Sequence, residues 1–151
     1  IEGVAALLEI KQVPIHVNKN ESAWVTRTTG ISEKDLAAHE SGDKLTVGEI
    51  DITFVHTPGH TPGSQCFLVE QRLVAGDTLF LEGCGRTDLP GSDPGEMYFS
   101  LQKLAQLPHD TLVCPGHQYS AIPSSDLGDV VATNNVFKPQ TQQQWLEWFG
   151  R

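Results

Sequence analysis

Three short apolar runs of this chain end near a glycine that is followed directly by a histidine or an aspartate. They lead into "HTPGH" (56–60), "GDTLF" (76–80) and "PGHQY" (115–119), in which the following side chains are His60, Asp77 and His117. Glycine permits the tight bend that places the next side chain at a strand end. Loops at the ends of neighbouring strands meet at one edge of a sheet, so we expect these side chains to converge although 57 positions separate the first from the last. Imidazole and carboxylate suit Zn, Fe and Mn, and the pattern predicts a metal site.

Each of these residues also has an ordinary structural interpretation. A single histidine in a turn is more often a surface or hydrogen-bonded residue than a ligand, and Gly-Asp is a common turn dipeptide. The threefold repetition of strand, glycine and ligand-type side chain, in this order, favours the metal site over these alternatives.

The predicted elements mix helices and strands, which favours sheets covered by helices over a helical bundle or an all-β sandwich. Turn signals at 48–49 and 70–71 predict hairpins, and Asp93 can cap a helix with Pro94 at its first position. The expected strands are 13–17, 44–55, 65–75 and 111–114. A long loop at 82–95 is expected between the third of these strands and the helix that follows it. The first expected helix is N-terminal, with Ile1, Val4, Ala5, Leu7 and Leu8 as its apolar positions. The others are 20–25 with Asn20 as N-cap, a turn at 32–38 capped by Ser32, one after Asp93 with Met97, Leu101 and Leu104 on one face, and 141–149 with Trp145, Trp148 and Phe149 on its packing side.

Length and composition limit the classes of protein. A chain of 151 residues has room for one domain with its own core, so we predict a single domain over 1–151. A net charge of −9 argues against nucleic acid or an anionic membrane as partner, because both reward clustered Lys and Arg. The 3 cysteines have no CxxC spacing, which indicates a reducing compartment. No apolar run approaches the ~20 residues of a membrane helix, so a cytoplasmic protein is expected.

The motifs "HTPGHTPGS", "GDTLF" and "PGHQY" resemble, in this order, the third, fourth and fifth metal-binding motifs of the metallo-β-lactamase superfamily. "GCGRTD" (83–88) is similar to a loop of the branch that contains glyoxalase II (hydroxyacylglutathione hydrolase) and persulfide dioxygenase. The resemblance implies an α+β architecture, the αββα sandwich, with metals at one edge of its two sheets. It implies that His60 binds the first metal, that His117 binds the second and that Asp77 bridges both.

Arg86 and Tyr119 lie in the loops that are expected to rim this site. There they would bind substrate, with the cation holding a carboxylate. A surface role is the alternative for either residue.

The first motif of the superfamily, H-x-H-x-D-H, does not occur in this sequence. In the family it precedes the helix with which this chain begins, so the resemblance implies the C-terminal part of the fold, without an N-terminal segment of strands and four ligands. Such a chain is expected to bind Zn or Fe weakly or not at all. It is also expected to expose apolar sheet surface, which favours a homodimer through that face.

Three functions remain open. The resemblance implies a hydrolase of a thioester or related ester, in which two Zn ions, bridged by the catalytic Asp77, activate a shared water as hydroxide. The substrate would be a small anionic thioester or thiol. The first alternative is an iron-dependent persulfide dioxygenase, with His60 and Asp77 in a triad around one Fe(II). The second alternative is a truncated structural or interaction domain, since the chain alone is expected to be inactive.

The remaining histidines and Cys84 are not expected to take part in chemistry. No base lies near Cys84 in the sequence, so a small loop residue is favoured over a nucleophile. His56 is expected to hydrogen-bond within its own turn. His16 is placed in a strand, His39 in a helical turn and His109 in a loop.

Overall fold

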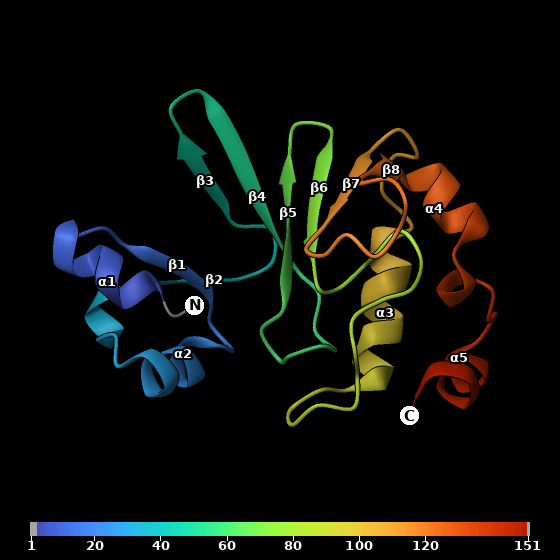
Figure 1. Cartoon of the computed structure of the whole chain (residues 1–151), viewed down its shortest axis with the longest axis horizontal. Helices are drawn as coiled ribbons and strands as arrows, with labels where there is room; N and C mark the ends of the chain where they lie inside the picture. Colours follow the sequence, from blue (N-terminus) through green and yellow to red (C-terminus); the bar gives the residue numbers. More distant parts are fainter. Residues whose placement is uncertain (1–2, 151) are drawn as a thin grey trace.

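The order of helices and strands follows the predicted alternation in most places. The computed structural model describes residues 3–150, so Ile1 of the predicted first helix lies outside the described residues. The helices are α1 (Gly3–Ile10), α2 (Ser22–Thr29), α3 (Pro94–Leu104), α4 (Leu127–Thr133) and α5 (Gln142–Phe149), with 3₁₀ turns η1 (Glu33–Asp35) and η2 (Asn135–Phe137). The strands are β1 (Ile15–Asn18), β2 (Leu36–His39), β3 (Lys44–Val47), β4 (Ile50–His56), β5 (Gln65–Val69), β6 (Arg72–Gly76), β7 (Leu112–Pro115) and β8 (Ser125–Asp126) (Figure 1).

Six strands form the main sheet, in the order β3-β4-β5-β6-β7-β8. The predicted hairpins are confirmed, with tight turns that use positive φ at Gly48 (63°) and Glu70 (53°). β5 is antiparallel to both β4 and β6, and β6 is parallel to β7, to which the chain returns through α3. Strands β4, β6 and β7 therefore all point the same way. Their C-terminal ends, where the three predicted ligand loops begin, lie at one edge of the sheet.

One face of this sheet is buried beneath the C-terminal helices, which lie to the right of the sheet in Figure 1. Cys66, Leu73, Ala75 and Val113 pack from the strands against side chains of α3, α4, η2 and α5. The predicted start of α3 is confirmed, because the Asp93 carboxylate accepts hydrogen bonds from the backbone N–H groups of Gly95 and Glu96. Its predicted apolar face is confirmed as well, since Met97, Leu101 and Leu104 are fully buried.

The packing side of α5 is narrower than predicted. Trp145 is fully buried, and its indole N–H donates to the carbonyl of Val136. Phe149, one helical turn later, packs against the same core. The prediction for Trp148 is wrong, because its side chain is 58% exposed. The core therefore takes the side chains four residues apart and leaves the neighbouring tryptophan on the surface.

A second, two-stranded sheet of parallel β1 and β2 lies with α1 and α2 on the left of Figure 1. Two predictions fail in this region. The helical turn that Ser32 caps ends at Asp35, and Leu36–His39 form β2 instead of helix, because pairing with Ile15–Asn18 satisfies their backbone groups from a distant segment. Asn20 does not cap α2; Glu21 precedes the helix, and the backbone N–H of Asn20 donates to the Asn18 side chain.

The face of the main sheet opposite the C-terminal helices carries apolar side chains. Val47, Ile50 and Val74 are 57%, 47% and 42% exposed. A hollow of about 340 Å³ on this face is lined by Phe54, Phe67 and further apolar residues together with His16. None of the helices within residues 3–150 is long and apolar enough to cross a membrane.

Candidate metal centre

His60 lies in the loop that follows β4. Gly59 has φ of 138° and packs so closely on α3 that a Cβ there would lie 2.5 Å from the Met97 Cα. The ring nitrogen Nδ1 of His60 lies 2.8 Å from the backbone carbonyl of Arg86. A carbonyl only accepts, so Nδ1 carries the hydrogen, and Nε2 lies on the other side of the ring, where in the neutral imidazole it has a free lone pair. This is the orientation that a second partner gives to a metal-binding histidine.

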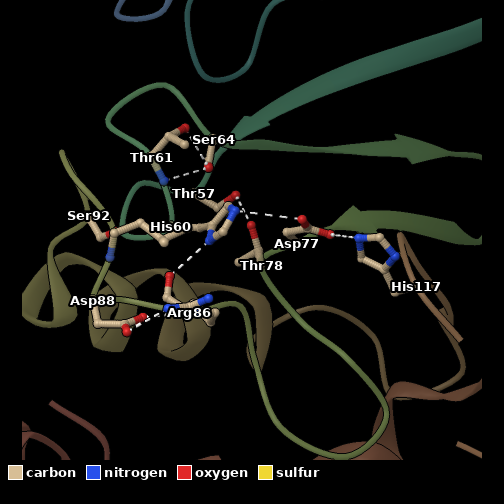
Figure 2. Close-up of polar contacts among 11 residues, drawn as sticks. Thr57, His60, Thr61, Ser64, Asp77, Thr78, Arg86, Asp88, Ser92 and His117 are labelled. Carbon is tan, nitrogen blue, oxygen red and sulfur yellow. Dashed lines mark hydrogen bonds and ion pairs between the residues drawn. The ribbon is translucent and has the colours of Figure 1, made fainter. Parts of the chain in front are cut away.

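Asp77 stands between the two predicted histidine ligands (Figure 2). Its Oδ2 lies 3.6 Å from Nε2 of His60, and its Oδ1 lies 3.4 Å from Nε2 of His117. The exposed fractions of the three side chains are 20% for His60, 36% for Asp77 and 54% for His117. With Nδ1 bonded to a carbonyl, His60 directs Nε2 at a carboxylate oxygen of Asp77. The structure thus brings all three predicted ligands together, with the two imidazoles on either side of the carboxylate.

The three side chains do not surround a single point. Over residues 3–150, no group of three or more His, Cys, Asp and Glu side chains is arranged to hold one ion. Each oxygen of Asp77 faces a different imidazole instead. The arrangement is a carboxylate between two imidazoles, not three donors around one point.

His117 follows β7 and is held close to Asp77 by the backbone. The N–H of Gly116 donates to the carbonyl of Gly76 at 2.9 Å. A Cβ on Gly116 would lie 2.9 Å from Oδ1 of Asp77, so the glycine permits the two loops to approach. The His117 ring stacks on Tyr119 with centroids 5.4 Å apart, and Phe80 makes T-shaped contacts with both rings.

Arg86 and Tyr119 both border the cleft, which has a volume of about 410 Å³ and also contains the three predicted ligands. The guanidinium of Arg86 is turned to Asp88, with two N–O distances of 2.8 Å. The hydrogen bond to Arg86 lowers the pKa of the Asp88 carboxyl, and the Arg86 pKa is raised in turn. Arg86 is 68% exposed, and it is the backbone carbonyl of this residue that reaches His60. Sequence reasoning missed that contact.

Cys84 and His56 have the structural roles expected of them. Burial raises the pKa of the Cys84 thiol to about 12, which keeps it protonated and unreactive at neutral pH. Nε2 of His56 lies 2.8 Å from the carbonyl of Pro62 in its own loop. His39, predicted in a helical turn, lies in β2 and pairs with His16 through ring nitrogens 2.7 Å apart.

Two buried hydroxyls beside the ligands were also missed. Thr57 and Thr78 belong to the ligand loops, and their Oγ1 atoms are 2.8 Å apart (Figure 2). Neither "HTPGH" nor "GDTLF" signals this contact, because it depends on how the two loops pack in the folded sheet.

The family model described as "Metallo-beta-lactamase superfamily" matches residues 2–117. The chain belongs to this superfamily. The resemblance of the motifs to this superfamily is therefore confirmed. Glyoxalase II enzymes are among the relatives, since a hydroxyacylglutathione hydrolase of Yersinia pestis is 47% identical over 79 residues, which are 52% of this chain and 31% of that protein.

A second superfamily relative covers more of the chain. The "Probable polyketide biosynthesis zinc-dependent hydrolase BaeB" of Bacillus velezensis is 32% identical over 119 residues, which are 78% of this chain and 53% of that protein. The chain thus spans about half the length of this relative and less of the Yersinia hydrolase.

Solved structures agree on the metallo-beta-lactamase fold, and the α+β class is confirmed as a part of that fold. A metallo-beta-lactamase from Staphylococcus aureus has a TM-score of 0.85 at 26% identity, covering 97% of this chain and 48% of that one. ETHE1 from Myxococcus xanthus has a TM-score of 0.73 at 23% identity, with 98% and 73% covered. TTHA1623, solved in a di-iron-bound form, has a TM-score of 0.72 at 30% identity, with 89% and 70% covered.

Proposed function

We propose that this chain carries the His60, Asp77 and His117 part of the metal centre of a hydrolase that acts on a thioester or related ester. The observation that carries the proposal is the carboxylate of Asp77, whose two oxygens face two different imidazoles at 3.6 and 3.4 Å. His60 would hold one ion, His117 the other, and Asp77 both. The hydrolase names of two relatives support the reaction class, and one of them is named as zinc-dependent.

When bound, such ions supply a nucleophile at neutral pH by lowering the pKa of water. The residues of this chain orient and enclose the site. The Arg86 carbonyl fixes the His60 ring through Nδ1. Phe80 is 8% exposed and packs beside His117, so it limits the access of bulk water to that side.

A small anionic thioester is the proposed substrate. The guanidinium of Arg86 is 68% exposed and uses Nε and one terminal nitrogen for Asp88. Its second terminal nitrogen is therefore available to a substrate carboxylate. The Tyr119 ring, 68% exposed and stacked on His117, offers a flat apolar surface for the remainder of the molecule.

Metal binding by matched variants tests the proposal directly. The three donors, divided between two ions, give each ion fewer than the three protein ligands of a catalytic site, so weak binding by the 151-residue chain is expected. We expect Co²⁺, titrated to millimolar concentration, to develop a visible absorption spectrum. Asp77→Asn should weaken binding more than His60→Ala or His117→Ala, because only Asp77 serves both ions. His109→Ala is the matched control, since His109 is an exposed loop histidine outside the cleft.

Activity is measured with an acylglutathione thioester on the longest product of the gene. Asp77→Asn is expected to lower kcat/KM by at least about 100-fold, which is the scale of losing an essential metal ligand or its orientation. An Asp77→Asn variant that binds Co²⁺ and hydrolyses the thioester like the wild type would contradict the proposed function.

An iron-dependent dioxygenase that acts on a thiol or persulfide is the second candidate. His60 and Asp77 would supply one imidazole and the carboxylate of the two-histidine, one-carboxylate set that binds Fe(II) in non-haem oxygenases, and TTHA1623 was solved in a di-iron-bound form. Metal analysis of protein purified without added metal separates the candidates. Zinc with thioester hydrolysis supports the first, and iron with thiol-dependent O₂ uptake supports the second. If the longest gene product contains no metal and has no activity, the result supports a structural or interaction domain.

A further inference from the structure

A chain of buried hydrogen bonds lies directly beneath His60 and Asp77. Thr57 precedes His60 by three positions, and Thr78 follows Asp77 directly. Their Oγ1 atoms are 2.8 Å apart, and the two residues are 0% and 1% exposed. Oγ1 of Thr57 also lies 3.4 Å from Sγ of Cys66, a fully buried residue of β5.

The donors and acceptors assign a single direction to this chain. The Cys66 thiol donates to the carbonyl of Ala75 at 3.4 Å. Burial raises the pKa of this thiol, so its hydrogen is present to be donated. Cys66 Sγ then accepts from the Thr57 hydroxyl, and Thr57 Oγ1 accepts from the Thr78 hydroxyl. This series of hydrogen bonds starts at the Thr78 hydroxyl, passes through Thr57 in the loop after β4 and Cys66 in β5, and ends at the carbonyl of Ala75 in β6.

We propose that Thr57 and Thr78 are positioning residues that set the distance between His60 and Asp77. The inference rests on the proposed metal-binding role of those two side chains. The Thr57 to Thr78 hydrogen bond joins the loop that carries one ligand to the loop that carries the other. Two methyl groups at the same positions would pack at about 3.5–4.0 Å instead, so replacing the bond by an apolar contact moves the loops apart by roughly 1 Å.

A shift of that size matters because a metal site tolerates only about 0.5 Å of misplacement. The second contact of His60 would change in the same movement. The Arg86 carbonyl belongs to a loop that is fastened to the Asp77 side, since the N–H of Gly85 donates to the Thr78 carbonyl and Leu79 bridges to Cys84. Movement of the His60 loop away from Thr78 therefore also lengthens the 2.8 Å contact between Nδ1 of His60 and the Arg86 carbonyl.

The test compares Thr57→Val and Thr78→Val, which remove a hydroxyl at nearly constant volume, with Thr57→Ser, which retains it. Thr111→Val is the matched control, because Thr111 is also buried, at 4% exposure, but lies at the opposite end of β7 from the ligands. Each valine variant should raise the Co²⁺ dissociation constant by about 10- to 100-fold, the range for residues that orient metal ligands. Thr57→Ser and Thr111→Val should stay within about threefold of the wild type, well below that range.

The double variant Thr57→Val/Thr78→Val separates positioning from stability. It leaves no hydroxyl of the pair without a partner, so its melting temperature should be at least that of the single variants. Its Co²⁺ affinity should remain as low as theirs, because the apolar contact is still too long. The proposal would be overturned if the double variant regained both its Co²⁺ affinity and its melting temperature. Wild-type Co²⁺ affinity in the single valine variants would overturn it as well. Equal losses in Thr57→Ser and Thr57→Val would also overturn it, since packing would then matter and the hydroxyl would not.

A metal-free measurement keeps this result apart from the proposed function. In the ¹H–¹⁵N spectrum of the histidine rings, the Nδ1–H of His60 should be protected by the Arg86 carbonyl in the wild type, Thr57→Ser and Thr111→Val. It should exchange rapidly in both single valine variants. If the wild type binds no Co²⁺ while this pattern is seen, the metal function fails and the positioning of His60 stands. A protected His60 proton in the valine variants would refute the positioning role regardless of metal.

Discussion

Gly85→Ala is the substitution for which the structure gives the sharpest expectation. A Cβ on Gly85 would lie 1.8 Å from the backbone carbonyl oxygen of Asp77 and 3.3 Å from Cγ of His60. A carbon and an oxygen in contact need about 3.3 Å or more, by the spacing of weak C–H to oxygen contacts. The added methyl group must therefore displace one of the two backbones by roughly 1.5 Å, the difference between that spacing and the 1.8 Å approach. A flexible side chain cannot absorb this shift, because the clash is with main-chain atoms.

The displacement separates Gly85–Arg86 from the loops that carry the ligands. It stretches the 3.4 Å hydrogen bond from the Gly85 N–H to Thr78 and the 2.8 Å contact between His60 and the Arg86 carbonyl. Overpacking costs about 1–3 kcal/mol, and each lost hydrogen bond adds about 1 kcal/mol. For a chain of this size, 1 kcal/mol corresponds to about 2–4 °C in melting temperature. With two hydrogen bonds lost, the cost is about 3–5 kcal/mol, and the expected decrease in melting temperature is roughly 6–20 °C.

Thermal unfolding followed by circular dichroism measures this decrease, and Co²⁺ titration measures the expected 10- to 100-fold loss of metal affinity. Gly3→Ala is the control, because no heavy atom lies within 4 Å of a Cβ at that position. A Gly85→Ala chain that melts within 1 °C of the wild type, on a scale of about 2–4 °C per kcal/mol, and keeps a protected His60 ring proton would refute the steric argument.

Three further outcomes are expected. Cys84, with its pKa raised to about 12, should resist a thiol reagent at pH 8, where only about one thiol in 10⁴ is ionised. Because an unfolded thiol ionises near pH 8.5, the stability that this group contributes is complete below that pH and is lost as the pH rises toward 12. Urea unfolding at pH 8 and pH 10 measures this loss. Arg86→Ala, in the longest gene product, should raise KM for an acidic thioester more than it lowers kcat, and an equal effect on a neutral thioester would remove Arg86 from the substrate site. Trp145→Ala should cost about 3–5 kcal/mol in urea unfolding, whereas Trp148→Ala, at an exposed site, should stay below about 1 kcal/mol.

The edge of the sheet could be predicted from the sequence because local signals determine it. An apolar run with a glycine at its end specifies both a strand and the direction in which the chain leaves it. Asp93, Pro94 and the apolar face of α3 were predictable for the same reason, since cap and periodicity lie within one segment. Leu36–His39 was not, because its partner β1 lies about twenty residues away and competes successfully with the local helical signal.

The contacts between the ligand loops depend on tertiary structure in the same way. No pattern within "HTPGH" or "GDTLF" states that Thr57 and Thr78 meet, because that follows from the strand order of the sheet. The same holds for Arg86. The sequence places a basic residue near the site, and only the fold shows that its carbonyl orients His60 while its guanidinium binds Asp88.

Strand spacing explains why the His60 loop differs from the other two. β6 and β7 are neighbours, about 4.8 Å apart, so Asp77 and His117 can meet when each follows its strand almost directly. β5 separates β4 from β6, and the ends of those two strands are therefore about 10 Å apart. A ligand at the end of β4, at the position of His56, would be too far from Asp77; His56 instead bonds to the carbonyl of Pro62 in the loop that follows. The chain has to cross the start of β5, and the four residues that follow His56, from Thr57 to His60, make this crossing. The prolines and glycines of this loop make the crossing rigid, and the bond from Thr57 to Thr78 fastens it across β5.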